Sequence, residues 1–297
     1  MKRGSVNINF TIGFGNNLFQ YAYGRLLAEK YNLILNHSAI LPLGIPERQS
    51  PIDKNMFHVT VGDNNCKNVM ENFHGPANYH INGYFEDYEL YKPHIKKIRS
   101  WFSSVEKTNN KDLILHMRLQ NRLVQESHHK NHITAEGFKK GIQKFDFDRL
   151  HIVTDAEKWD YYTEEDIEKI RYHIKIGPNP NEPWVPVSRS LEHMNSLIDG
   201  LKEYDPVVHC NGAKMIKKSG GLRDNFIDDF NLIRSFNKIM FYNSTFSWWA
   251  SLLSDATQIG VFGPWKPRKH NCRNLGKTDY PGWFSWGSVE DLYWKNV

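Results

Sequence analysis

The sequence predicts an α/β protein made of two domains, each of Rossmann type. The chain has 297 residues, which is more than a single hydrophobic core normally serves. It opens with a strand signal, a tight glycine-bearing loop and a helix signal, as a Rossmann-like unit does. Further along the chain strands and helices alternate, which indicates a mainly parallel sheet.

The first elements follow from local periodicity. Residues 5–12 alternate apolar with smaller or polar side chains, which predicts a strand, and apolar residues recur at helical spacing over 18–30. Between them, residues 13–17 predict a tight loop whose glycines allow positive φ and close backbone approach. Residues 37–77 are rich in Pro, Asn and Gly, and we expect loops and short elements there.

A polar segment without apolar periodicity, residues 106–111, precedes a fresh apolar run at 113–115. We place the domain boundary near it, with an N-terminal domain of residues 1–108 and a C-terminal domain of residues 109–297. A capping box formed by Thr163 and Asp166 predicts a helix start, and four prolines over 177–190 predict a connection. In this second domain we expect strands at 113–115, 150–153, 207–208, 239–242 and 259–262, and helices around Phe138, from near Thr163, around Phe230 and from Phe246.

The composition is that of a folded protein, with 40% hydrophobic and 24% charged residues. Lys and Arg number 38 against 33 Asp and Glu, and this modest excess suits a nucleotide diphosphate. There is no dense basic stripe, so we expect no nucleic-acid partner. Aromatic residues reach 13%, which suits either stacking on sugars or an aromatic core.

Cysteine usage and the first residues bear on localisation. Cys66, Cys210 and Cys272 are far apart and lack metal-type spacing, so we expect reduced thiols and no metal site. The first residues contain no long apolar segment of the kind that a signal peptide or membrane anchor needs. We therefore expect a cytoplasmic protein of bacterial or viral type without a transmembrane segment.

Two segments carry candidate chemistry at predicted strand ends. His116 and Arg118 end the apolar run 113–115, where an arginine can hold a diphosphate with two hydrogen bonds and stabilise a leaving group. Residues 243–250 lie between a strand and a helix, so hydroxyls and amides gather at a helix N-terminus that suits a phosphate. The alternative to phosphate binding is that Ser244 or Thr245 serves only as an N-cap. Trp248 and Trp249 would then only fill the core.

Together these segments resemble the bacterial α-1,2-fucosyltransferases, glycosyltransferase family 11, and more remotely the α-1,6- and protein O-fucosyltransferases. Leu115-His116-Met117-Arg118 is similar to the start of the family's HxRRxD motif, and Ile152-Val153-Thr154-Asp155 to its next strand end. Residues 243–252 resemble its NSTFSWWAAxL block, and Gly83-Tyr84-Phe85-Glu86-Asp87 its GYFQD element. The N-terminal signature, a GLGNQ-like loop running into FQYA, is matched by Gly13-Phe14-Gly15-Asn16-Asn17-Leu18-Phe19-Gln20-Tyr21-Ala22.

The resemblance implies a GT-B-like fold with a cleft between two Rossmann-type domains, a GDP-L-fucose donor, a glycan acceptor, inversion at the anomeric carbon, and neither a cofactor nor a metal ion. It implies that residues 1–108 form the acceptor-side domain and that residues 109–297 bind the nucleotide sugar. It implies catalytic roles for Arg118 and His116. The donor-binding residues that it implies are Gly13, Phe14, Gly15, Asn16, Asn17, Asp155, Asp229, Asn243, Ser244, Thr245, Phe246 and Ser247.

Two departures from the family pattern leave alternatives open. Leu119 stands where the family has a second arginine, and Asn121 stands where it has an aspartate. A different donor, such as another GDP-sugar or UDP-xylose, and a non-catalytic carbohydrate- or nucleotide-binding protein are therefore the other readings. The sequence does not select a general base among Glu86, Asp87, Glu126 and Asp155, and it leaves the acceptor, the linkage and the oligomeric state open.

Overall fold

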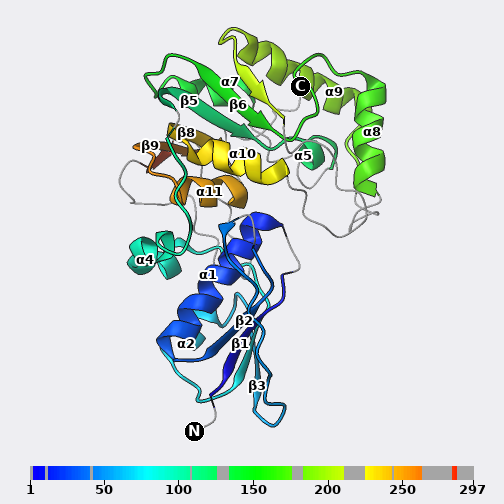
Figure 1. Ribbon diagram of the computed structural model, residues 1–297. Helices are drawn as coiled ribbons and strands as arrows, with labels where there is room; N and C mark the ends of the chain where they lie inside the picture. Colours follow the sequence, from blue (N-terminus) through cyan, green and yellow to red (C-terminus); the bar gives the residue numbers. More distant parts are fainter. Residues whose placement is uncertain are drawn as a thin grey trace. The chain divides into compact units, whose positions relative to one another are not determined.

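A computed structural model describes residues 3–10, 13–40, 43–107, 109–125, 134–175, 183–210, 225–242, 244–262 and 283–285 (Figure 1). Within these residues the chain divides between Ser104 and Val105 into two compact parts, here unit 1 and unit 2. The predicted limits 1–108 and 109–297 stay a prediction, since most of 263–297 lies outside the described residues.

Unit 1 contains a four-stranded parallel sheet in the order β2-β1-β4-β3. Helices α1 and α2 cover the same face of it, as the two right-handed crossovers β1-α1-β2 and β3-α2-β4 require (Figure 1). The bounds are β1 Ser5–Ile8, α1 Phe14–Lys30, β2 Ile34–His37, β3 His58–Val61, α2 Cys66–Glu71, β4 Asn78–Ile81, α3 Tyr88–Tyr91, the 3₁₀ turn η2 Lys92–His94 and α4 Ile95–Arg99.

The start of α1 corrects two expectations. The strand β1 ends at Ile8 rather than at residue 12, and the helix begins at Phe14 rather than at residue 18. Asn17 donates its backbone N–H to Gly13 O at 3.0 Å, so most of the predicted loop is the first helical turn. Gly13 has a φ of −62°, so positive φ is not what this glycine supplies. Farther along α1, a Cβ on Gly24 would come within 2.6 Å of Ile8, so this glycine lets the helix lie close to the sheet.

The opposite face of the unit 1 sheet is polar. Asn36 donates to Asn7 Oδ1 at 2.9 Å across neighbouring strands, and Ser5 donates to Asn78 Oδ1 at 2.8 Å. Asn36 Oδ1 also accepts from Ser50 N at 2.8 Å, and Asn78 donates to Asp53 O at 2.8 Å. These amides hold the irregular segment that follows β2 against the sheet, which accounts for the Asn-rich composition of this part of the chain.

Unit 2 contains a six-stranded parallel sheet in the order β10-β9-β8-β5-β6-β7. Counted along the chain, this is the strand order of a Rossmann fold, and the order reverses between β5 and β8. The bounds are β5 Asn109–Met117, β6 Leu150–Thr154, β7 Val207–His209, β8 Phe236–Tyr242, β9 Gln258–Phe262 and β10 Trp283–Ser285.

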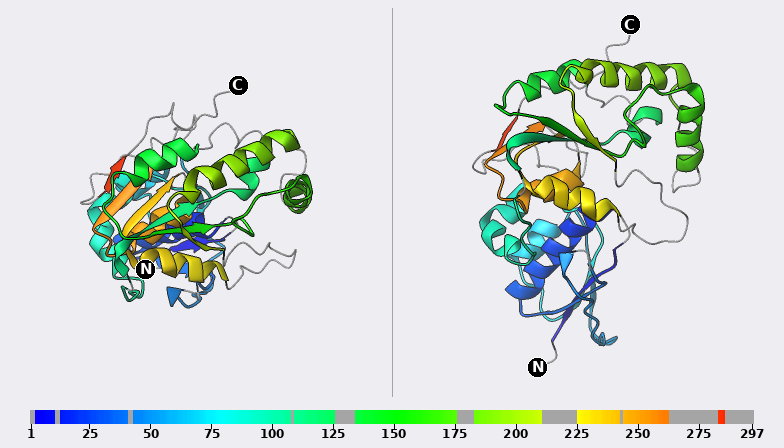
Figure 2. Two further views of the ribbon diagram at one scale, coloured as in Figure 1. Left: turned by 90° about the horizontal axis from the view of Figure 1, so that it is seen from above. Right: turned by 45° about the horizontal axis from the view of Figure 1, so that its top comes forward.

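Helices cover both faces of the unit 2 sheet, with α7 and α9 on one face and α10 and α11 on the other (Figures 1 and 2). The core contains the central strands and the faces of α7, α8 and α9, with Leu115, Phe138, Ile152, Ile167 and Leu197 fully buried or nearly so. The helix bounds are α5 Gln120–Val124, α7 Ala135–Ile142, α8 Glu164–Lys175, α9 Val187–Lys202, α10 Asn225–Arg234 and α11 Thr245–Leu252.

Two expectations for the helices of unit 2 have different outcomes. The capping box is confirmed, since Thr163 N donates to Asp166 Oδ2 at 2.8 Å and Asp166 N donates to Thr163 Oγ1 at 3.3 Å. The predicted connection 177–190 is wrong at its end, because α9 begins at Val187. This helix lies close to α7, and a Cβ on Gly200 would come within 2.3 Å of the Cβ of Ala135.

Two units with parallel, helix-connected sheets make up a GT-B-like α/β architecture, so the predicted fold class is confirmed. The cleft that we expected between the two domains stays a prediction.

Candidate functional site

The carboxyl edge of the unit 2 sheet gathers the predicted residues of this unit. His116 lies near the end of β5 and Arg118 directly follows that strand, while Ser244 precedes α11 just after β8. The side chain of Ser247, in the first turn of α11, contacts Nδ1 of His116. Because β5 and β8 are the strands between which the order reverses, this contact lies where open α/β sheets bind their ligands.

His116 is neutral at physiological pH. Its side chain is buried at 7% exposure, and burial, followed by the positive charges of Arg118 and Arg122, lowers its pKa to about 3. In the tautomer in which Nδ1 accepts from the Ser247 hydroxyl, the ring proton lies on Nε2. A neutral donor there can hydrogen-bond a ligand oxygen without adding charge.

The N-terminus of α11 supplies backbone donors to the same place. Ser244 is the N-cap, with its side chain accepting from Ser247 N at 3.4 Å, and Trp248 N donates to Ser244 O at 2.9 Å. Helix geometry therefore leaves the amides of Thr245 and Phe246 without an intrahelical acceptor, in a position that favours an anion. Ser244 is thus the N-cap of α11, as the capping alternative predicts. The core alternative holds for Trp248 and Trp249, both fully buried, and Asn243 lies outside the described residues.

Two carboxylates approach the same edge from neighbouring elements. Asp155, after β6, accepts from Leu119 N at 2.5 Å and so ties the segment that carries Arg118 to the end of β6. Asp229 lies on α10 at 5% exposure. Burial, then Asp229 and then Asp155 raise the pKa of Cys210, next to β7, to about 11. Asp229 and Asp155 therefore each lie near Cys210.

Sequence reasoning missed Arg122. This arginine lies on α5 at 7% exposure, and its charge lowers the pKa of His116 as that of Arg118 does. The one signal in the sequence was its closeness to Arg118, which it follows by four positions. Leu119, by contrast, is fully buried in the core, so position 119 does not face a ligand.

The remaining predicted donor-binding residues belong to unit 1. Gly13 is the N-cap of α1 and supplies no side-chain cap, and Phe14, Gly15, Asn16 and Asn17 form the first turn. Oδ1 of Asn16 and Oδ1 of Asn17 are buried and have no hydrogen-bond partner among the described residues. Gln20, one turn further, donates to Gly83 O at 3.0 Å, which brings this turn beside the element after β4. Donor contact by these residues stays a prediction.

The Gly83–Asp87 element is tightly held in unit 1. Phe85 has a φ of 54°, unusual for a side chain of its size, and its N–H donates to Asp63 Oδ1 at 2.6 Å. Its ring stacks on Tyr23 at 4.4 Å. Asp87 caps α3 and pairs with Lys67 at 2.7 Å, so its carboxylate has a structural role. Glu86 is buried at 1% exposure.

Among the described residues no cluster of three or more His, Cys, Asp or Glu could hold a metal ion. The D-x-D sequence Asp146-Phe147-Asp148 lies just before β6, at the amino end of the strand and so at the edge opposite to His116. Of the helices in the described ranges, none is both long and apolar enough to span a membrane.

The fold and the site define an α/β protein with a Rossmann-type unit, at whose carboxyl edge two arginines, a neutral histidine and a helix N-terminus lie together. No family model matches the sequence, and no curated protein matches it. Among solved structures it is similar to a mutant of Arabidopsis thaliana FUT1 in complex with GDP, with a TM-score of 0.44 and 10% identity over 91% of this chain and 71% of that chain. The fold assignment rests on the strand order of the two sheets.

Proposed function

We propose that the protein is a glycosyltransferase that binds a nucleoside diphosphate sugar at the carboxyl edge of unit 2 and transfers the sugar to a hydroxyl of a glycan. The observation that carries this proposal is the convergence of Arg118, Arg122, neutral His116 and the N-terminus of α11 at the reversal point of a Rossmann-ordered sheet. Each of these groups favours an anion or donates to one.

The arrangement suits departure of a diphosphate without a metal ion. Arg118 makes no hydrogen bond or ion pair with any described residue, so its guanidinium is available to two phosphate oxygens at once. The amides of Thr245 and Phe246 add fixed dipoles, and His116 Nε2 adds a neutral donor. Together they stabilise the negative charge that builds on the leaving group, which is the task of a divalent cation in metal-dependent transferases.

We propose that the nucleoside lies near Asp229 and Asp155, which the family resemblance implies as donor-binding residues. Asp229 and Asp155 both raise the pKa of Cys210, which follows β7 at the carboxyl edge, and a carboxylate there can accept hydrogen bonds from ribose hydroxyls or from a base. We propose GDP-L-fucose as the donor, transferred with inversion. The motif resemblance supports this choice, and the departures at Leu119 and Asn121 leave other GDP-sugars and UDP-xylose as the second candidates.

Calorimetric titration of the purified protein with GDP, UDP, GDP-fucose and UDP-xylose tests the proposal. We expect GDP and GDP-fucose to bind, and Arg118→Gln to weaken GDP at least 10-fold through loss of charge-assisted hydrogen bonds. Arg149→Gln is the matched control, because Arg149 is exposed and precedes β6 at the opposite edge. Failure of every nucleotide to bind, or equal effects of the two replacements, would contradict the proposal. Binding without donor hydrolysis or transfer would favour a non-catalytic binding protein.

A further inference from the structure

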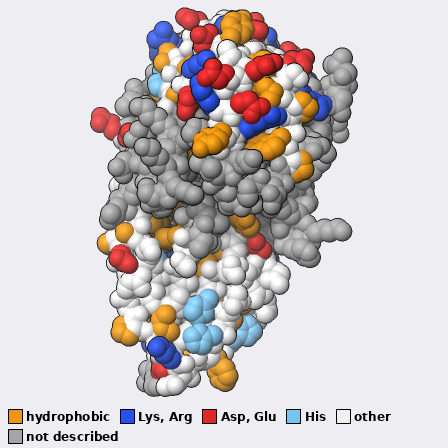
Figure 3. Space-filling view, turned by 90° about the vertical axis from the view of Figure 1, so that its right-hand side faces the viewer, with side chains coloured by type: hydrophobic (Ala, Val, Ile, Leu, Met, Phe, Trp, Pro, Cys, Tyr) orange, Lys and Arg blue, Asp and Glu red, His pale blue; other side chains and the backbone are white. Residues whose placement is uncertain are grey.

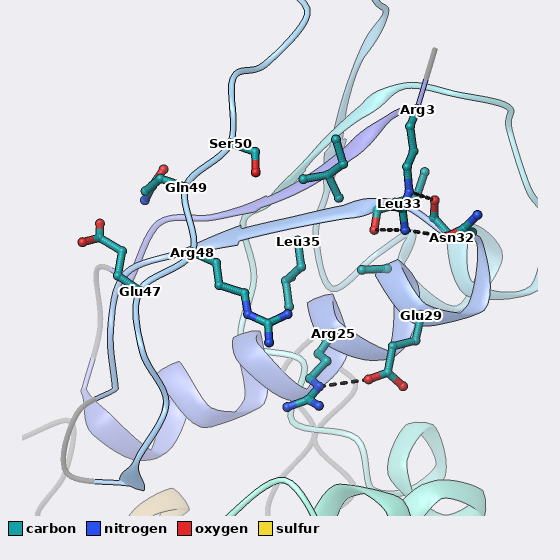
Figure 4. A pocket seen from close by; sticks show the side chains of 12 residues that line it. Arg3, Arg25, Glu29, Asn32, Leu33, Leu35, Glu47, Arg48, Gln49 and Ser50 are labelled. Carbon is teal, nitrogen blue, oxygen red and sulfur yellow. Dashed lines mark hydrogen bonds and ion pairs between the residues drawn. The ribbon is translucent and has the colours of Figure 1, made fainter. Parts of the chain in front are cut away.

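A second polar hollow, of about 730 Å³, lies within unit 1. It is bounded by the second half of α1, the start of β2 and the segment 47–50, with Arg3 at one side (Figure 4). Residues 32–35 contribute the amino end of β2, and the segment 47–50 runs beside Asn36 and His37 at the carboxyl end of the same strand. The lining includes no residue of 13–17 or 83–87, so it differs from the unit 1 residues that we predict to contact the donor. The volume of the hollow is in the range of sites that bind small molecules.

Three arginines from three elements face this hollow. Arg25 comes from α1, Arg48 from the segment after β2, and Arg3 from the residues before β1 (Figure 4). The two acidic side chains at the hollow are Glu29 and Glu47. Glu29 is already paired, with Arg25 at 2.9 Å and with Lys97 at 2.6 Å. Although burial raises the pKa of Glu29, these two cations lower it overall, so the carboxylate stays ionised within its pairs.

The charges of Arg3 and Arg48 have no acidic partner within the described residues. Arg3 donates to the backbone and side-chain oxygens of Asn32, which are neutral acceptors. The Arg48 side chain makes no hydrogen bond or ion pair with a described residue, and it extends toward α1 while Glu47 extends the other way (Figure 4). The hollow thus keeps an excess of positive charge, which favours an anionic ligand.

The guanidinium of Arg25 is held in place before a ligand arrives, and Arg48 is held at its backbone. Arg25 lies 4.3 Å over the Trp101 ring and donates to Tyr21 Oη at 2.8 Å. The backbone of Arg48 is fixed by exchanging hydrogen bonds with His37, at 2.8 and 3.0 Å. A rigidly placed guanidinium loses little side-chain entropy when it binds an oxyanion.

We propose that this hollow binds a sugar that carries an oxyanion, a carboxylate or a phosphate, with the oxyanion between Arg25 and Arg48. The hollow is much larger than a bare phosphate needs, and Asn32, Gln49 and Ser50 add polar groups that suit sugar hydroxyls. The proposal does not depend on the donor site of unit 2.

Titration of the full chain with glucuronate, glucose 6-phosphate, glucose and inorganic phosphate tests this site. We expect at least one of the two acidic sugars to bind saturably and more tightly than inorganic phosphate, and glucose to bind much more weakly. Arg48→Gln should weaken the acidic sugar about 10-fold or more. Lys54→Gln is the control, because it removes the same charge from an exposed position of unit 1 that does not line the hollow.

The same titrations in Arg118→Gln separate the two sites. Retained binding of the acidic sugar in that variant supports the unit 1 site, whatever happens to GDP. Absence of binding by both acidic sugars, equal weakening by Arg48→Gln and Lys54→Gln, or loss of binding in Arg118→Gln would overturn the proposal. Glucuronate and glucose 6-phosphate, compared with each other, identify the oxyanion.

Discussion

The burial of His116 predicts a defined loss of stability in mild acid. Its folded pKa is about 3 against the usual 6.5, so the unfolded chain takes up this proton first as the pH falls. The contribution is fully present above pH 6.5 and is lost progressively below it. Between about pH 7.5 and about pH 5.5, the linkage relation gives a loss of about 1.4 kcal/mol from this one side chain. Any folded pKa of His116 below about 5 gives nearly the same loss of unfolding free energy, so the prediction depends only on the imidazole being buried and neutral at about pH 5.5.

Urea unfolding of the wild type and of His116→Gln at both pH values is the assay. The difference between the two pH effects isolates His116, because a constant cost of the replacement cancels. The pH dependence contributed by the other histidines with lowered pKa values cancels as well, because both proteins contain them. These are His37, His80, His94 and His209. We expect the wild type to lose about 1.4 kcal/mol more than His116→Gln. Equal losses would refute the buried, neutral state of His116 beside Arg118 and Arg122.

Four further predictions concern the proposed donor site and the packing of unit 2. Arg118→Ala should lower turnover by about 10²–10³ in a folded protein, and Arg118→Lys should not restore it, since lysine lacks the guanidinium fork; near-normal turnover would shift the role to the α11 terminus. Asp229→Ala should weaken donor binding by about 1.5–3 kcal/mol in titrations, and an unchanged affinity would give Asp229 a structural role. A chelator should leave the transfer rate unchanged, and restoration of a lost rate by manganese would contradict metal independence. Gly200→Ala should lower the free energy of unfolding, measured in urea, by about 1–3 kcal/mol, because the new Cβ meets that of Ala135. This loss should exceed the gain from the better helix propensity of alanine. A gain in stability would show that α7 and α9 can separate.

The central strands of unit 2 could be predicted because each is a short apolar run between polar turns. The runs at 113–115 and 239–242 lie in β5 and β8. Both strands are longer than the predicted runs, and they follow one another along the chain in the predicted order. The helix α9 was missed although Met194, Leu197, Ile198 and Leu201 recur at helical spacing. The prolines before it indicated a connection, and Pro186 is in fact its N-cap, where proline does not interrupt a helix.

The candidate site was predictable in part, for a topological reason. The carboxyl ends of parallel strands meet at one edge, so His116 and the residues before α11 could be placed together without knowing the strand order. The contact of His116 with Ser247 depends on β5 and β8 being neighbours, which only the structure gives. Arg122 lies on a helix of five residues, too short to show a period in the sequence. Glu126 and Asn243 lie outside the described residues.

The structure explains the leucine at position 119 by its burial rather than by the ligand. From the sequence, a leucine in place of the second arginine of the HxRRxD motif leaves open a different donor or a non-catalytic binding protein. In the structure, Leu119 is fully buried in the core and its N–H is held by Asp155 at 2.5 Å. An arginine with this orientation would bring an unpaired charge into the core, at a cost that burial of leucine avoids. Arg122, one turn further along, acts on His116 together with Arg118. The charge of Arg122 is therefore close enough to His116 to help keep that imidazole neutral, although position 119 carries no charge.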